Sequence, residues 1–246
     1  MKNLFSVLLL FSVTITFAQH NEQKSLLKEA NDALTLLPTD PEKIYKEAKI
    51  IETRAQEIKA GEAELKAIQI QYEYYKIKND FTHMMETSKK LSVKATKYNA
   101  LYYQVVAKRY LFESYLFTDL PEKAFNELQE GMELANKLDK KDALSTEERF
   151  NYYITYSNFY LFKEDFKNQL KYIKMGGIEL QNLVDSDYKK RVLPIHYSNL
   201  ASSFMTNKEM DSARFYASLS QKLLKVDDSH GVKFNNWMVL GKAEMN

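Results

Sequence analysis

The side chains best suited to proton transfer or metal binding near neutral pH are the four histidines, His20, His83, His196 and His230. No two of them have the spacing of a helical zinc site such as His-Glu-x-x-His. The chain has no cysteine, which removes thiolate metal ligands, disulfides and a thiol nucleophile. We therefore predict no metal site, and we interpret each histidine as solvated or as hydrogen-bonded inside the protein.

Motifs for phosphate binding and acyl transfer are missing as well. Gly176-Gly177 is the single glycine pair, and neither a glycine-rich phosphate loop nor a nucleophile elbow occurs. Acidic residues are spread at the spacing of a helical surface, as at Glu62 and Glu64, which is not a pattern typical of catalytic carboxylates. The sequence therefore predicts a protein that is not an enzyme and that needs no cofactor.

The charge balance argues against two classes of partner. Lysine and arginine total 35, aspartate and glutamate total 33, and the formal net charge is +2. Nucleic acid or an anionic membrane would call for a larger basic surplus on one face. We predict a mixed, solvated surface that binds neither.

The N-terminus has the three parts of a secretory signal peptide. Lys2 gives a positive start, residues 4–17 are uncharged and largely apolar, and Thr16-Phe17-Ala18 offers small residues for cleavage. The apolar run is shorter than the roughly 20 residues that span a bilayer. We predict that residues 1–18 are removed, that the mature chain begins at Gln19 without a membrane span, and that it is exported to a bacterial periplasm or cell envelope.

Composition and breaks predict helices throughout. The chain has only 6 glycines and 4 prolines, and its apolar residues recur at helical spacing in roughly eleven segments. We interpret Asp40-Pro41 as a helix start, Gly61 as the close of the preceding helix, and Ser145 as the first residue of a capping box. The expected breaks lie near 38–41, 61, 79–80, 118–121, 140–145 and 206–208.

An internal repeat organises these helices. Trp237-x-x-Leu240-Gly241 resembles the opening of a tetratricopeptide repeat, and the preceding unit has Ala201 and Ala213 at the matching small positions. The residues at the eighth repeat position are 72, 112, 157, 201 and 241, so the units are 40 to 45 residues long. The standard unit has about 34 residues. Two early units also carry Tyr72 and Phe112 where the family has a small residue.

The resemblance implies an all-α fold in which antiparallel helical hairpins stack as a right-handed α-solenoid, similar to tetratricopeptide proteins but with longer repeats. Residues 19–61 are then an N-terminal helical hairpin, and residues 62–246 form the repeats. The last repeat is incomplete, and we expect its second helix and further segments beyond Asn246.

The same resemblance implies a protein or peptide ligand in a concave groove lined by the first helix of each unit. The residues that fall at groove positions are Gln69, Glu73, Lys76, Arg109, Glu113, Asn151, Asn158, Ser198 and Ser202. The family's clamp for a terminal carboxylate is not expected, because Asn158 lacks the accompanying lysines. Arg109 has two interpretations, a ligand contact or an ion pair with Glu113 four residues on.

Two functions fit a binding domain of this kind. Long-repeat tetratricopeptide arrays behind a signal peptide are similar to the exported N-terminal regions of membrane-bound regulators of the Bacteroidota, which carry a helix-turn-helix (AraC-type) or kinase output module. The alternative is a free-standing periplasmic scaffold that assembles other envelope proteins. The DNA downstream of codon 246 distinguishes the two, because a membrane helix there selects the regulator.

Overall fold

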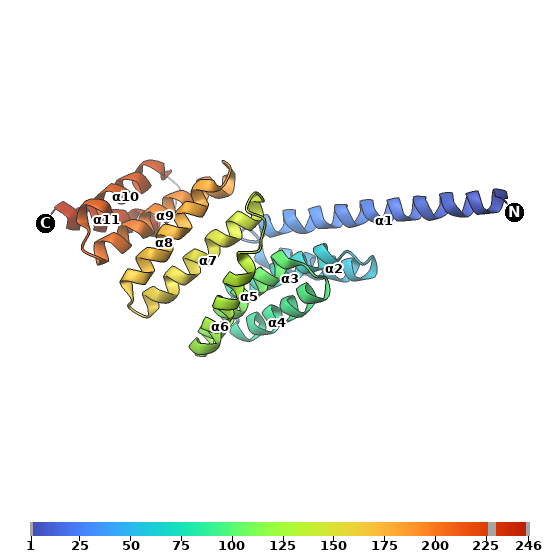
Figure 1. The fold of residues 1–246 in the computed structure, drawn as a ribbon, viewed down its shortest axis with the longest axis horizontal. Coiled ribbons are helices and arrows are strands. Elements are labelled where there is room, and N and C mark those ends of the chain that lie inside the picture. Colours follow the sequence, from blue (N-terminus) through green and yellow to red (C-terminus); the bar gives the residue numbers. More distant parts are fainter. Residues whose placement is uncertain (1, 226–229, 245–246) are drawn as a thin grey trace. The chain divides into compact units, whose positions relative to one another are not determined.

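A computed structural model describes the backbone of residues 2–225 and 230–244 and the side chains of residues 19–225 and 230–244 (Figure 1). The predicted signal peptide, residues 1–18, lies outside the residues whose side chains are described. Among the described residues, no helix combines the length and the apolar character that crossing a bilayer requires.

Eleven helices and no strands make up the described ranges, which confirms the predicted all-α fold. The helices are α1 (Lys2–Leu36), α2 (Pro41–Glu57), α3 (Gly61–Ile77), α4 (Phe81–Lys97), α5 (Leu101–Phe117), α6 (Pro121–Ala135), α7 (Ala143–Phe162), α8 (Phe166–Asn182), α9 (Asp187–Thr206), α10 (Met210–Leu223) and α11 (His230–Glu244).

The chain forms two compact units, Met1–Gly131 and Met132–Asn246, with the boundary inside α6. In the first unit α2 packs against α3, α3 against α4 and α4 against α5, and in the second unit α7 to α11 also pack in chain order. Short connections make consecutive helices antiparallel, as the ribbon in Figure 1 shows. Each unit is therefore a stack of helical hairpins, as predicted.

One type of turn recurs in both units. Six connections have three residues, and the middle residue of each has a positive φ between 51° and 63°; these residues are Lys59, Asn79, Asn99, Asp119, Glu164 and Lys208. The third residue donates its N–H to the carbonyl five residues earlier, as Ala60 does to Ala55 at 2.8 Å. This is the Schellman closure of a helix, which satisfies carbonyls that the helix end leaves unpaired.

The breaks at 98–100, 163–165 and 183–186 were not predicted from the sequence. The predicted breaks near 38–41, 79–80, 118–121 and 206–208 are confirmed, with Asp40 and Asp80 accepting N-cap hydrogen bonds. The role predicted for Gly61 is wrong, because Lys59 closes α2 and Gly61 begins α3. A Cβ on residue 61 would lie 3.1 Å from the Tyr98 ring, so the glycine permits close packing of α3 and Tyr98.

The predicted capping box at Ser145 is also wrong, because Ser145 is not the N-cap residue of its helix. Helix α7 begins three residues earlier in the chain than the box implies, and Asp142 is its N-cap. The Asp142 carboxylate accepts a hydrogen bond from the Ser145 backbone N–H at 2.8 Å. Serine and aspartate both suit an N-cap, so the local sequence alone did not distinguish them.

Small residues lie where the repeat register places them. Ala201, Ala213 and Ser220 are fully buried, and the two alanines belong to one apolar cluster of α8, α9, α10 and α11. Gly176 lets α8 approach the Tyr153 and Ile154 side chains of α7, where a Cβ would lie 3.3 Å from Ile154. The helices of a hairpin therefore touch at these positions.

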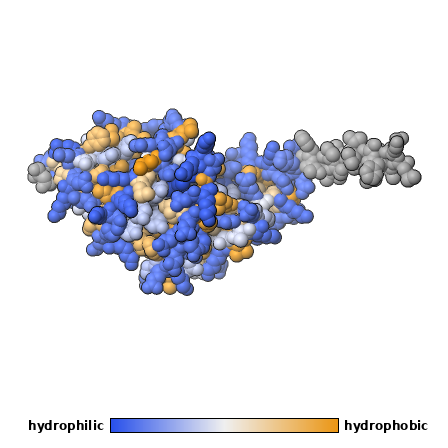
Figure 2. All heavy atoms as spheres, in the orientation of Figure 1, coloured by the Kyte–Doolittle hydropathy of each residue, from blue (hydrophilic) through white to orange (hydrophobic). Residues whose placement is uncertain are grey.

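The first and last repeats depart from this pattern of small residues. Tyr72, at a nominally small position, is fully buried and stacks on Tyr110 with ring centroids 3.7 Å apart. At Gly241 a Cβ would meet nothing within 4 Å, and Trp237 is exposed, so no helix among the described residues covers this face of α11. On the face shown in Figure 2, hydrophilic residues cover most of the described surface, with apolar ones scattered between them.

We expect Ala201→Trp and Ala213→Trp to destabilise the second unit by about 1 to 3 kcal/mol each, because an indole in a filled contact forces the two helices apart. Urea denaturation followed by circular dichroism measures the loss. Phe215→Trp is the matched control, since Phe215 lies on α10 with 58% of its surface exposed. If all three variants unfold at the same urea concentration, the repeat register is wrong.

Candidate functional site

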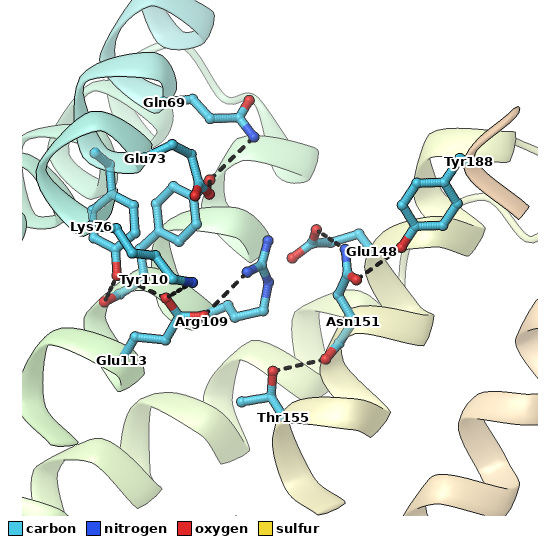
Figure 3. Close-up of polar contacts among 11 residues, drawn as sticks. Gln69, Glu73, Lys76, Arg109, Tyr110, Glu113, Glu148, Asn151, Thr155 and Tyr188 are labelled. Carbon is cyan, nitrogen blue, oxygen red and sulfur yellow. Dashed lines mark hydrogen bonds and ion pairs between the residues drawn. The ribbon is translucent and has the colours of Figure 1, made fainter. Parts of the chain in front are cut away.

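Five of the predicted groove residues lie in the first unit, and the fold pairs most of them with one another (Figure 3). Glu113 of α5 is the centre of one cluster. Its carboxylate accepts hydrogen bonds from Lys76 at 2.6 Å and from the Tyr72 hydroxyl at 3.1 Å. The Arg109 guanidinium lies 3.5 Å from the other carboxylate oxygen, and both side chains are mostly buried. Of the two interpretations of Arg109, the structure thus shows the ion pair with Glu113.

Gln69 and Glu73 of α3 both contact the Tyr110 hydroxyl of α5. Tyr110 donates a hydrogen bond to the Glu73 carboxylate and accepts one from the Gln69 amide at 3.3 Å. Burial, with the nearby negative charge of Glu73, raises the pKa of Tyr110 well above its ordinary value. The hydroxyl thus stays protonated and keeps donating to Glu73. These hydrogen bonds join α3 to α5 and occupy polar groups that a ligand on these two helices would otherwise contact.

Asn151, on α7 in the second unit, also has internal partners. Its amide donates to Glu148 at 3.4 Å, and its carbonyl oxygen accepts from the Tyr188 hydroxyl of α9 at 3.0 Å (Figure 3). It does not line the cavity that contains the other predicted residues of this unit. The structure therefore separates Asn151 from Asn158, although the two share a helix.

The remaining three predicted residues do come together. Asn158 of α7 and Ser198 and Ser202 of α9 line an open cavity of about 420 Å³, which α8 and α11 complete. Its walls also include the apolar side chains of Ile154 and Ile173. Among the described residues, the twelve that line it carry no charge. We call this cavity the amide groove, after the asparagine and glutamine side chains that line it.

Asn235 of α11 is a lining residue that the sequence analysis missed. Its amide donates to the Ser198 hydroxyl at 2.7 Å, and its carbonyl oxygen accepts from the Ser202 hydroxyl at 2.8 Å. These bonds hold α11 against α9 and orient both serines. A signal was present, because the register that sets Trp237 at repeat position 4 puts Asn235 at groove position 2.

Gln169 of α8 is the second missed residue. Its side chain is 7% exposed, and its amide nitrogen donates to the Ser203 hydroxyl at 2.8 Å. Its carbonyl oxygen has no hydrogen-bond partner among the described residues. A buried acceptor without a donor costs about 1 to 3 kcal/mol. The signal in the sequence was a polar residue at a repeat position that normally holds a small one.

Two further amides of the groove are available to a ligand. Asn158 and Asn199 are exposed, and neither side chain makes a hydrogen bond within the described part of the chain. Each amide offers two N–H donors and one carbonyl acceptor. The groove therefore combines serines held in place by Asn235 with two amides that have unused hydrogen-bonding capacity.

A second cavity of the same unit, about 250 Å³, is lined by His196 and Gly177 among others. His196 is 2% exposed, and neither ring nitrogen has a hydrogen-bond partner in the described ranges. Its interpretation as a solvated or hydrogen-bonded histidine is therefore wrong. Burial lowers the pKa of His196 to about 4, so the ring is neutral at neutral pH. A Cβ at Gly177 would lie 2.8 Å from His196 Nε2, so only glycine accommodates the ring there.

The residues that the structure describes contain no group of three or more histidine, aspartate or glutamate side chains placed to hold a metal ion.

The stacked antiparallel hairpins define a helical-repeat protein of the α-solenoid class. A solved protein of similar structure is BtubC (BKLC) from P. vanneervenii, with a TM-score of 0.57 and 12% sequence identity. The similarity covers 86% of this chain and 99% of that one. At this identity the likeness concerns the fold alone. No family model matches the sequence, and no curated protein matches it.

Proposed function

We propose that this chain is a non-enzymatic binding domain of the tetratricopeptide kind, and that the amide groove takes a protein or peptide partner. The observation that carries the proposal is the convergence of Asn158, Ser198 and Ser202 on one open cavity. These residues come from two repeat units, and the resemblance to the family assigned all three to a ligand groove. The hydrogen-bonding capacity of Asn158 and Asn199 gives a partner something to bind.

We further propose that the domain acts in the bacterial envelope, as the sensory or interaction part of a signal-transduction or transcriptional regulator. The support is the signal-peptide pattern of residues 1–18 and the resemblance to exported regions of Bacteroidota regulators. Ligand occupancy would then alter the stacking of the hairpins that meet at the groove.

Partner capture tests the groove. Immobilised residues 19–246 should retain envelope proteins, identified by mass spectrometry, and the double variant Asn158→Ala/Asn199→Ala should retain about tenfold less, since two direct hydrogen bonds of roughly 0.5 to 1.5 kcal/mol each are lost. Asn126→Ala is the matched control, because Asn126 is exposed on α6 and does not line the groove.

Two results would contradict this assignment. Equal capture by the double variant and the control removes the amide groove from consideration. A loss confined to Arg109→Ala, with an unchanged melting temperature, would instead place the partner on the α3 and α5 face, where Arg109 contacts Glu113.

A further inference from the structure

We propose that the amide groove selects an uncharged segment of its partner, one that donates hydrogen bonds, and that it does not recognise a carboxylate, a phosphate or a basic side chain. This inference rests on the proposed function, because it names the chemistry of the partner at the same groove. It follows from the absence of charge among the described lining residues, from the amides of Asn158 and Asn199 and from the apolar walls.

The first argument is electrostatic. Charged residues make up 28% of the chain, yet the twelve described residues that line the groove are all neutral. A charged side chain that entered the groove would lose water without gaining an ion pair. Partial loss of water around a charge without an ion pair is unfavourable, and one hydrogen bond returns only about 0.5 to 1.5 kcal/mol. The groove therefore discriminates against charged segments of either sign.

The second argument is the match of donors and acceptors. Asn158 and Asn199 each present donors and an acceptor together, and the group with the complementary pattern is another amide. Gln169 adds a carbonyl oxygen without a donor, and its amide nitrogen is already used by Ser203. A partner that supplies an N–H or O–H near Gln169 removes the cost of that unpaired acceptor. Main-chain amides and the side chains of Asn, Gln, Ser and Thr all meet this requirement.

The third argument concerns the apolar part of the lining. Ile154, Leu161, Ile173 and Val232 present aliphatic carbon beside the amides. Each buried methylene of a partner side chain contributes about 0.8 kcal/mol there. The preferred segment thus combines neutral polar residues with small aliphatic ones such as alanine and valine.

An array of synthetic nine-residue peptides tests the selectivity. The peptides are built from Gly, Ala, Val, Ser, Thr, Asn and Gln, and each has partners in which the central residue becomes Asp, Glu, Lys or Arg. We expect neutral peptides to bind residues 19–246, and one central charge of either sign to lower binding at least about tenfold. Affinity for the neutral peptides should change less than about twofold between roughly 50 and 500 mM NaCl, because no ion pair is screened.

Substitutions in the groove provide the second measurement. Asn158→Asp and Asn199→Asp keep the shape and add a negative charge, so neutral peptides should bind about tenfold more weakly and peptides with a central lysine should gain affinity. Asn126→Asp is the control and should change neither. Gln169→Leu removes the unpaired acceptor, and we expect it to weaken peptide binding severalfold while the protein still unfolds cooperatively at a similar temperature.

The outcomes separate this inference from the proposed function. If charged peptides bind best, or if affinity falls steeply with salt, the inference is overturned even when Asn158→Ala/Asn199→Ala reduces capture. If that double variant leaves capture unchanged, the groove is not the binding site and the proposed function fails as well. An array on which neutral peptides bind no better than their charged counterparts also overturns the inference.

Discussion

Glu64→Leu should lower the free energy of unfolding of the first unit by about 3 to 5 kcal/mol, the usual cost of breaking a buried ion pair from one side. Glu64 of α3 has no exposed surface, and its carboxylate accepts from Lys94 of α4 at 2.7 Å and from Gln56 of α2 at 2.9 Å. The Tyr98 hydroxyl donates to the other carboxylate oxygen. One side chain thus joins three consecutive helices.

The charge state of Glu64 supports this role. Burial raises the pKa of the Glu64 carboxyl, but the hydrogen bonds from Lys94, Tyr98 and Gln56 together lower it below its ordinary value. The group therefore remains ionised at neutral pH. Leucine in its place would leave the Lys94 ammonium, which is 26% exposed, and two neutral donors without their acceptor.

Urea denaturation of Glu64→Leu, Lys94→Leu and the double variant measures the effect. We expect the double variant to lose less stability than the sum of the single variants, because it leaves no unpaired charge behind. Glu29→Ala is the control, since Glu29 forms an exposed ion pair with Arg54 and such pairs contribute about 0 to 1 kcal/mol. Equal small losses for Glu64→Leu and Glu29→Ala would show that Glu64 does not hold the helices together.

Acidification from pH 6.5 to pH 4 should cost roughly 3 kcal/mol of stability through His196 alone. The pKa of His196 is about 4 in the folded protein, against an ordinary value of 6.5, because burial disfavours the charged ring. Between these values the unfolded chain binds a proton that the folded protein does not. Stability therefore falls by about 1.4 kcal/mol for each pH unit of acidification in this window. Above pH 6.5 and below pH 4 the two states bind protons alike at this residue, and its contribution is constant.

The matched measurement compares the natural protein with His196→Phe, which keeps an aromatic ring against Phe150 and Gly177 but cannot titrate. Carboxylates also titrate between pH 4 and 6.5, so the difference between the two unfolding curves isolates His196. Among the described residues that line the cavity of His196, Lys174 is the charged one. Curves that remain parallel from pH 7.5 to pH 4 would show that burial does not affect this histidine.

Where the helices and the repeat lie could be predicted because those signals are local. Apolar spacing and small residues at Ala201 and Ala213 report on the face of a single helix and on its immediate neighbour. The register that these residues set also located Asn158, Ser198 and Ser202, three of the residues that line the amide groove. The breaks at 98–100 and 163–165 were not predicted, and there Asn99 and Glu164 have the positive φ that a glycine usually supplies at a helix end.

The state of each polar side chain was decided by the tertiary structure. From its spacing Glu64 was interpreted as a surface residue, yet α2 and α4 cover it. His196 was interpreted as solvated or hydrogen-bonded, yet its ring lies enclosed by α7 and α8. The sequence allows Arg109 either a ligand contact or an ion pair with Glu113, and only the fold shows that Lys76 and Tyr72 contact the same Glu113 carboxylate.

The amino-acid sequence by itself thus determined the all-helical class, the repeat and the helix faces, because helical periodicity depends on residues three or four positions apart. Tertiary structure alone decided which groups on those faces are paired, buried or available to a partner. Hydrogen-bond partners such as Tyr110 and Glu73, or Asn235 and Ser198, are 37 residues apart, and their contact depends on how two separate hairpins stack.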